Sequence, residues 1–228
     1  MTRPQIEGGR VAQWDGVTDR EAYKETFLAE RDRLADAAHR GDWAGVLAAV
    51  AEAPGLANGR RIGGRSGWAP LHQAAWHGAP AEVVEQLVAA GAWRTLRSAD
   101  GERPVDVAVR HGREALVPLL EPAPVHPAPE RALRAMEHFL HALVRVRTEE
   151  AAVTTALLPM QVSVLTEVPD AALWFAVPGM YGGFSVRLED AATTPWLTIK
   201  SHCRVVGGSG QTHRITPDGC ALVEEGWG

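Results

Sequence analysis

The feature that most constrains the fold is a short motif that recurs after 34 residues. Residues 67–78 read Gly-Trp-Ala-Pro-Leu-His-Gln-Ala-Ala-Trp-His-Gly, and residues 101–112 read Gly-Glu-Arg-Pro-Val-Asp-Val-Ala-Val-Arg-His-Gly. A glycine, a proline, an alanine and a final glycine occupy the same places in both copies. A period of this length is typical of stacked repeats, each a turn followed by two short helices. We therefore expect helical pairs that stack side by side in this part of the chain.

An earlier segment extends the pattern toward the N-terminus. Residues 37–41 (Ala-Ala-His-Arg-Gly) match residues 74–78 (Ala-Ala-Trp-His-Gly) with a shift of 37, and the glycine-rich loop at 58–66 can hold the additional residues. The spacing of Thr18 and Glu21 is that of a helix-capping pair, so the first helix is predicted to begin at Thr18. Small alanines allow close helix packing, and glycine suits the left-handed residue that ends a helix. The expected helices are 18–40, 42–52, 70–77, 80–90, 104–111 and 113–120.

These repeats resemble the ankyrin repeat, whose signature is Thr-Pro-Leu-His-x-Ala, over about residues 35–121. The match is incomplete, because Ala69 and Arg103 replace the threonine and Asp106 replaces the histidine of the third copy. The resemblance implies a module that binds another macromolecule on its concave side, through the variable residues before each glycine and through the loop tips. Carried over by position, the expected binding residues are His39, Arg40, Trp68, Trp76, His77, Trp93, Arg94, Arg97, Arg110 and His111.

The loops of this region are rich in arginine. Against two acidic residues, Asp100 and Glu102, they carry six arginines: Arg60, Arg61, Arg65, Arg94, Arg97 and Arg103. Tryptophan and arginine are the side chains most often found at energetic hot spots of interfaces. The pattern therefore predicts a protein partner with an acidic patch. The alternative is a solvated face, on which Trp93 only covers the neighbouring repeat.

Composition excludes several classes of protein. A hydrophobic fraction of 46% in 228 residues indicates a globular chain of two units. No apolar run approaches the roughly 18 to 20 residues of a membrane span, and the first residues lack a secretory signal. Two cysteines form no disulfide framework or zinc cluster, so we expect a cytoplasmic protein without cofactor or metal. The net charge of −5 argues against bulk attraction to nucleic acid or to a membrane. It says nothing about oligomeric state.

Four prolines within residues 121–130 predict a semi-rigid linker at 122–129. It would separate an ankyrin-repeat domain at 18–121 from a second domain at 130–228, and residues 1–17 are expected to be an N-terminal tail. The predicted fold is a mainly α ankyrin-repeat solenoid of about three repeats plus an N-terminal helix, followed by a small α+β domain with an antiparallel meander. Its expected elements are helices at about 130–147 and 149–167, then strands near 172–177, 184–189, 197–205, 211–216 and 220–223.

The second domain carries no family signature that we recognise, and its chemistry is open. His202 and Cys203 are adjacent, but alternation along a strand places them on opposite faces, so they make a poor catalytic pair. His138 and His141 lie one helical turn apart without a third metal ligand. We therefore expect no catalytic residue and no metal site, and favour a non-enzymatic interaction protein, compatible with an inhibitor or immunity-type role. The alternative is a small-molecule-binding or enzymatic module, delivered by the repeats, with a pocket of Trp174, Phe175, Tyr181, Phe184, His202 and His213.

Overall fold

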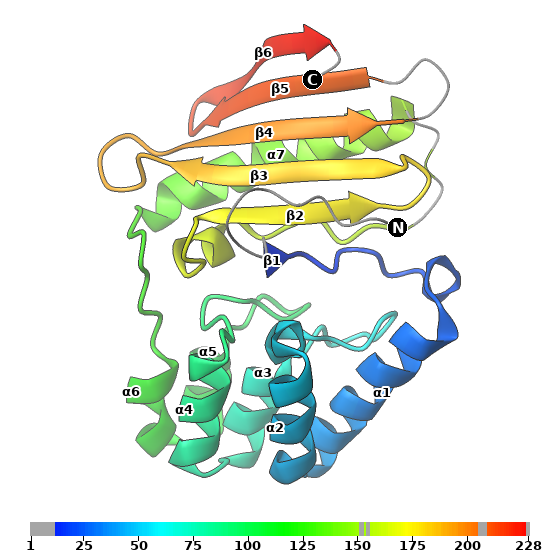
Figure 1. The fold of residues 1–228 in the computed structure, drawn as a ribbon. Helices are drawn as coiled ribbons and strands as arrows, with labels where there is room; N and C mark the ends of the chain where they lie inside the picture. The colour runs from blue at the N-terminus through cyan, green and yellow to red at the C-terminus, as the bar shows by residue number, and fades with distance from the viewer. Residues whose placement is uncertain (1–11, 151–152, 154–155, 205–208, 227–228) are drawn as a thin grey trace. The chain divides into compact units, whose positions relative to one another are not determined.

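A computed structural model describes residues 12–150, 153, 156–204 and 209–226. Contacts divide the chain into two compact units, which are shown in Figure 1. The helical unit comprises residues 18–123, and the sheet unit comprises residues 1–17 together with 124–228. The α+β organisation expected from the sequence is confirmed. No helix among the described residues has the length and apolar character that a membrane crossing requires.

The helical unit, described over its whole length, consists of three helical pairs. They are α1 (Glu25–Arg40) with α2 (Trp43–Glu52), α3 (Pro70–His77) with α4 (Ala81–Ala89), and α5 (Pro104–Arg110) with α6 (Val117–Leu120). The first helices α1, α3 and α5 contact one another in one layer, and α2, α4 and α6 form the second layer. Short 3-10 turns lie at Arg20–Ala22, Pro54–Asn58 and Glu114–Leu116.

Small residues allow these helices to pack closely. The alanines of the repeated positions are all buried in one core: Ala37, Ala38, Ala74, Ala75 and Ala108. Two of the repeated glycines, Gly41 and Gly78, end α1 and α3 with φ angles of 71° and 67°, where a side chain would be strained. Sequence periodicity therefore located both the contact faces and these helix ends.

Two helix boundaries differ from the prediction. The capping residue near the N-terminus is Asp19, whose Oδ1 accepts from the Glu21 N–H at 2.9 Å, and it begins only a 3-10 turn. The first α-helix starts later, at Glu25. At the other end of the unit, α6 is a single turn that contains Pro118 near its start. A proline has no N–H to donate, so it is accommodated there in the first turn.

The sheet unit contains six strands in the order β1-β2-β3-β4-β5-β6 among the described residues. Strands β2 (Ala172–Val177), β3 (Gly182–Glu189), β4 (Trp196–Cys203), β5 (Ser209–Thr216) and β6 (Gly219–Gly226) form an antiparallel meander. Strand β1 (Ala12–Gln13) pairs with β2 in parallel. Helix α7 (Glu130–Glu150) lies against one face, as Figure 1 shows.

Two expectations for this unit differ from the structure. The described part of the proposed N-terminal tail, residues 12–17, belongs to the sheet unit through β1. The helix expected at 149–167 is wrong, because α7 is described as far as Glu150 and, among the described residues 153 and 156–167, the only helical segment is a 3-10 turn at Val162–Thr166. Parts of three expected elements lie outside the described residues. They are residues 151–152 and 154–155 of that segment, the expected strand end at Val205, and residues 207–208 of the expected turn at 207–210.

Alternation along the strands divides the sheet into an apolar face and a polar face. The face toward α7 carries buried side chains from four strands: Leu173, Phe175, Val177, Phe184, Val186, Leu188, Leu197, Ile199, Cys203 and Ile215. Helix α7 contributes Leu133, Met136, Leu140 and Val144 to the same core. The opposite face exposes Arg187, Lys200 and Arg214. As predicted, His202 and Cys203 lie on opposite faces.

Candidate interaction surface

Aromatic and imidazole rings lie at both ends of α3, at the start of α2 and at the C-terminal end of α5. We define the aromatic row as Trp43, Trp68, Trp76, His77 and His111. The ring centroids of Trp76 lie 4.1 Å from those of His111 and 5.6 Å from those of Trp68. Trp43 and His77 make an edge contact at 5.8 Å. Because tilted and edge-on rings attract one another, these contacts hold Trp68, Trp76 and His111 in one group and Trp43 and His77 in another.

Hydrogen bonds also hold two of these residues, His77 and Trp76. Nε2 of His77 lies 2.9 Å from the carbonyl oxygen of His39, so this nitrogen carries the proton and donates. The Arg113 guanidinium reaches the carbonyl oxygen of Trp76 at 3.5 Å. Trp76 nevertheless remains 42% exposed, the largest value for an aromatic side chain among the described residues of the helical unit. An indole that is positioned but not covered is available to a partner.

His72, directly beneath the row, joins the second and third helical pairs. It is fully buried and its ring lies 6.2 Å from that of Trp68. Nδ1 accepts from the Ala69 N–H at 3.3 Å, and Nε2 donates to the Glu102 carbonyl at 3.1 Å. Burial lowers the pKa of His72 to about 4, so the ring is neutral near pH 7. The imidazole thus binds the backbone at the start of α3 and connects it to the turn before α5.

Asp106 occupies the position of His72 in the third pair and has the same local role. Its Oδ2 accepts from the Arg103 N–H at 2.8 Å, and the Arg103 guanidinium binds both carboxylate oxygens at 3.0 Å. The hydrogen bond from Arg103 is the main reason that the pKa of Asp106 lies below its ordinary value. Asp106 therefore caps the start of α5 as His72 caps the start of α3.

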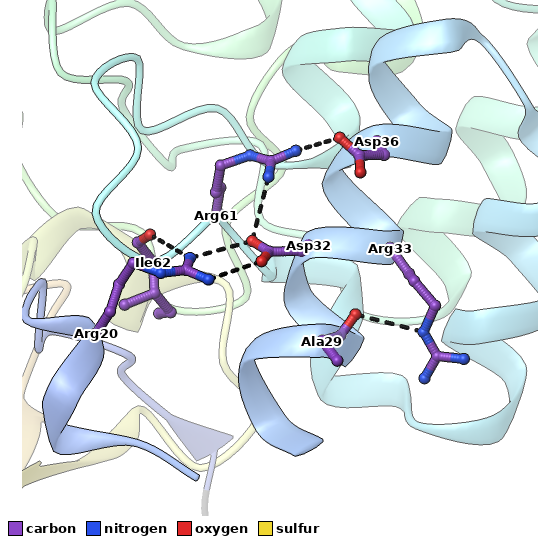
Figure 2. A network of polar contacts seen from close by, with 7 residues as sticks. All are labelled: Arg20, Ala29, Asp32, Arg33, Asp36, Arg61 and Ile62. Atoms are coloured by element: carbon purple, nitrogen blue, oxygen red, sulfur yellow. Dashed lines mark hydrogen bonds and ion pairs between the residues drawn. The ribbon is translucent and has the colours of Figure 1, made fainter. Parts of the chain in front are cut away.

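Most arginines expected at the binding edge bind to the helical unit itself. Figure 2 shows Arg61 paired with Asp32 and Asp36 of α1, while Arg20 holds the other side of Asp32 at 2.8 Å. The hydrogen bond from Arg20 is the main reason that the pKa of Asp32 is lowered. Arg110 binds Glu102 through two bonds of 2.7 and 2.8 Å. Of the six loop arginines, Arg61 and Arg103 are paired with carboxylates, so the cationic edge is smaller than the sequence suggested.

Two of the expected binding residues are buried. Trp93 is 9% exposed, and its backbone N–H donates to Asn58 Oδ1 at 2.7 Å. Arg97 is 7% exposed. Arg94 is half-buried and its Nη1 donates to the carbonyl oxygens of Leu119 and Glu121 at 3.5 and 3.2 Å. Assigning Trp93 and Arg97 to an open surface was therefore wrong, because both side chains are buried.

The remaining expected residues stay accessible. His39, Arg40, Trp76, His77 and Arg110 are exposed, and Trp68 and His111 are half-buried. Sequence reasoning missed Trp43, which begins α2 and not a first helix, so the ankyrin pattern gave it no assigned position. It also missed Asn58, whose Nδ2 donates to the Gly91 carbonyl at 2.8 Å while its Oδ1 holds Trp93.

The six residues of the alternative pocket do not converge. Phe175 and Phe184 lie inside the core between the sheet and α7, with their ring centroids 6.0 Å apart. Trp174 and His202 lie on the opposite face, and Tyr181 is 71% exposed in the turn after β2. His213 is buried on the α7 side. Strand alternation separates them, so the structure gives no common cavity lined by this set.

Comparisons with known proteins add no assignment. No protein-family model matches the chain, and no curated protein matches it.

Proposed function

We propose that the helical unit is a short, degenerate ankyrin-type stack that binds a protein partner through the aromatic row. The stacking of α1, α3 and α5 in one layer supports this proposal, as do the left-handed glycines that end α1 and α3. The matching cap roles of His72 and Asp106 support it further, because equivalent positions of two repeats hold equivalent backbone donors.

The observation that carries the proposal is the exposed indole of Trp76, held between Trp68 and His111. A tryptophan that is already ordered loses little conformational freedom when a partner covers it, and it buries a large apolar area. Such side chains are often the hot spots of interfaces. Neighbouring rings would exclude water around the contact.

The partner that fits this surface combines an apolar side chain with an acidic one. The apolar residue would cover Trp76, and the acidic residue would meet Arg40, which is exposed at the end of α1. Arg110 is a weaker anchor, because a partner carboxylate would have to displace Glu102. We place this binding in a reducing cytoplasm, in keeping with the two free cysteines, Cys203 and Cys220.

Selection from a displayed library of random peptides against the intact protein tests this proposal. We expect enriched peptides to pair an aromatic or aliphatic residue with Asp or Glu. Trp76→Ala should weaken them about 30-fold or more, as expected for a hot-spot tryptophan. Trp76→Phe should retain part of the affinity because it keeps a ring in the row.

Tyr181→Ala is the matched control, since Tyr181 is an exposed aromatic residue of the other unit. Far-ultraviolet circular dichroism and thermal unfolding establish that each variant is folded. Peptides that bind Trp76→Ala as tightly as the unmodified protein would refute the proposal. The small-molecule alternative is not proposed, because its six residues are divided between the two faces of the sheet.

A further inference from the structure

The sheet face opposite α7 carries a cluster of cations in registered positions. Arg187 of β3 and Arg214 of β5 both pair with Thr198 of β4, so they flank the central strand. Strands are about 4.8 Å apart, which places the two arginine backbones about 10 Å from each other. Lys200 lies two residues further along β4 on the same face, and all three cations are exposed.

Positive charge is crowded at one end of this face. The pKa of His202 lies below its ordinary value, first because of burial and then because Lys200 and Arg204 are positively charged. The acidic residues of the face lie toward its margins: Glu189 pairs with Trp196 in register, and Glu224 accepts from Thr212 Oγ1 at 3.5 Å. Although the chain has a net charge of −5, this face is locally positive, and an anionic ligand would complement it.

Indole rings and hydroxyl groups lie among these cations. Trp174 of β2 and Trp196 of β4 are half-buried on the same face, and the Arg214 guanidinium lies 4.3 Å above the Trp196 ring. Ser185, Thr198 and Thr212 supply hydroxyl donors from three adjacent strands. A sheet face that combines cations, hydroxyls and aromatic rings can bind phosphates and stack bases at the same time.

We propose that this face of the sheet unit, built around Arg187, Lys200 and Arg214 with Trp174 and Trp196, binds single-stranded nucleic acid. A single strand uses both features of the face, because its phosphates match the cations and its unpaired bases match the indoles. An acidic peptide would use only the cations. The negative charge of the whole chain opposes bulk attraction, so the predicted binding is local and weakens steeply with salt.

Fluorescence anisotropy of the intact protein with labelled oligo-uridylate and oligo-thymidylate of about 12 nucleotides tests the proposal. We expect binding at low salt, weaker binding of an abasic strand of equal length, and little binding of a duplex. The double variant Arg187→Gln, Lys200→Gln should lose at least tenfold in affinity. It should also reduce the slope of log affinity against log salt by about 1.4, because each lost phosphate contact contributes about 0.7.

The matched control is Arg131→Gln, Arg145→Gln, which removes the same charge from exposed positions of α7. It should bind as the unmodified protein does. No binding of either strand at low salt would overturn the proposal, as would equal losses in the double variant and its control. If poly-glutamate competes as well as the oligonucleotide at equal charge, the face binds acidic peptides and the proposal is wrong. None of these outcomes depends on Trp76.

Discussion

Acidification should destabilise the helical unit through His72, and the size of the effect follows from its environment. The folded state keeps this ring neutral down to about pH 4, whereas an unfolded chain protonates it near its ordinary pKa of 6.5. Between these two values the unfolded state binds more protons, so stability falls as the pH falls. Below about pH 4 both states are protonated and no further loss comes from this group.

The magnitude can be worked from the two pKa values. A shift of one unit corresponds to about 1.4 kcal/mol, so the full effect is about 3 kcal/mol, of which about 2 kcal/mol is lost between pH 7 and pH 5. The pKa values of His202 and His213 are also lowered from 6.5, mainly by burial, so the unmodified protein alone is not decisive. His72→Gln supplies the comparison, because an amide can accept from Ala69 and donate to Glu102 without titrating.

Urea unfolding of the intact protein at pH 7 and pH 5 measures the difference. Hydrogen exchange followed by mass spectrometry on peptides from α3 and α5 assigns the transition to the helical unit. The unmodified protein should lose about 2 kcal/mol more than His72→Gln over this interval. Equal losses in the two proteins would refute the reasoning and would mean that water or a rearranged loop hydrates the ring.

Three further substitutions, one of them a control, test the packing. Asn58→Ala should cost about 1 to 2 kcal/mol, measured by urea unfolding, because it removes the bonds to Gly91 and Trp93. Gly182→Ala should lower the thermal midpoint sharply, because its Cβ would lie 2.0 Å from the carbonyl oxygen of His202, whereas Gly219→Ala meets no atom within 4 Å and should have little effect. Equal midpoints for the two glycine variants would contradict the strand register.

Short-range signals in the sequence account for most of the helical unit. Pro70 and Pro104 begin first helices and Gly41 and Gly78 end them, so local backbone preferences mark those boundaries directly. Alternation likewise located β2 to β5. Strand β1 was not predicted, because two residues are too few to show a period and its partner strand lies far along the chain.

The site was harder to predict than the fold because accessibility depends on contacts that are distant in sequence. Arg97 and Arg65 look alike in a loop, yet one is buried and the other exposed. Arg61 is neutralised by carboxylates of α1, which no local pattern reveals. The exposure of Trp76 could be predicted because the repeat pattern fixed its position on a helix. Residues on loops had no such reference.

The two-residue strand β1 changes what a truncation of this protein would mean. Residues 12–17 precede the helical unit yet belong to the body formed by 124–228, and Trp14 is buried there with its Nε1 bonded to the Leu158 carbonyl. The stack is therefore an insertion, tethered to one body at both of its ends. After a single proteolytic cut at either junction, β1 would still be able to pair with β2. Residues 1–121 expressed alone would lack both β2 and the Leu158 carbonyl that binds Trp14.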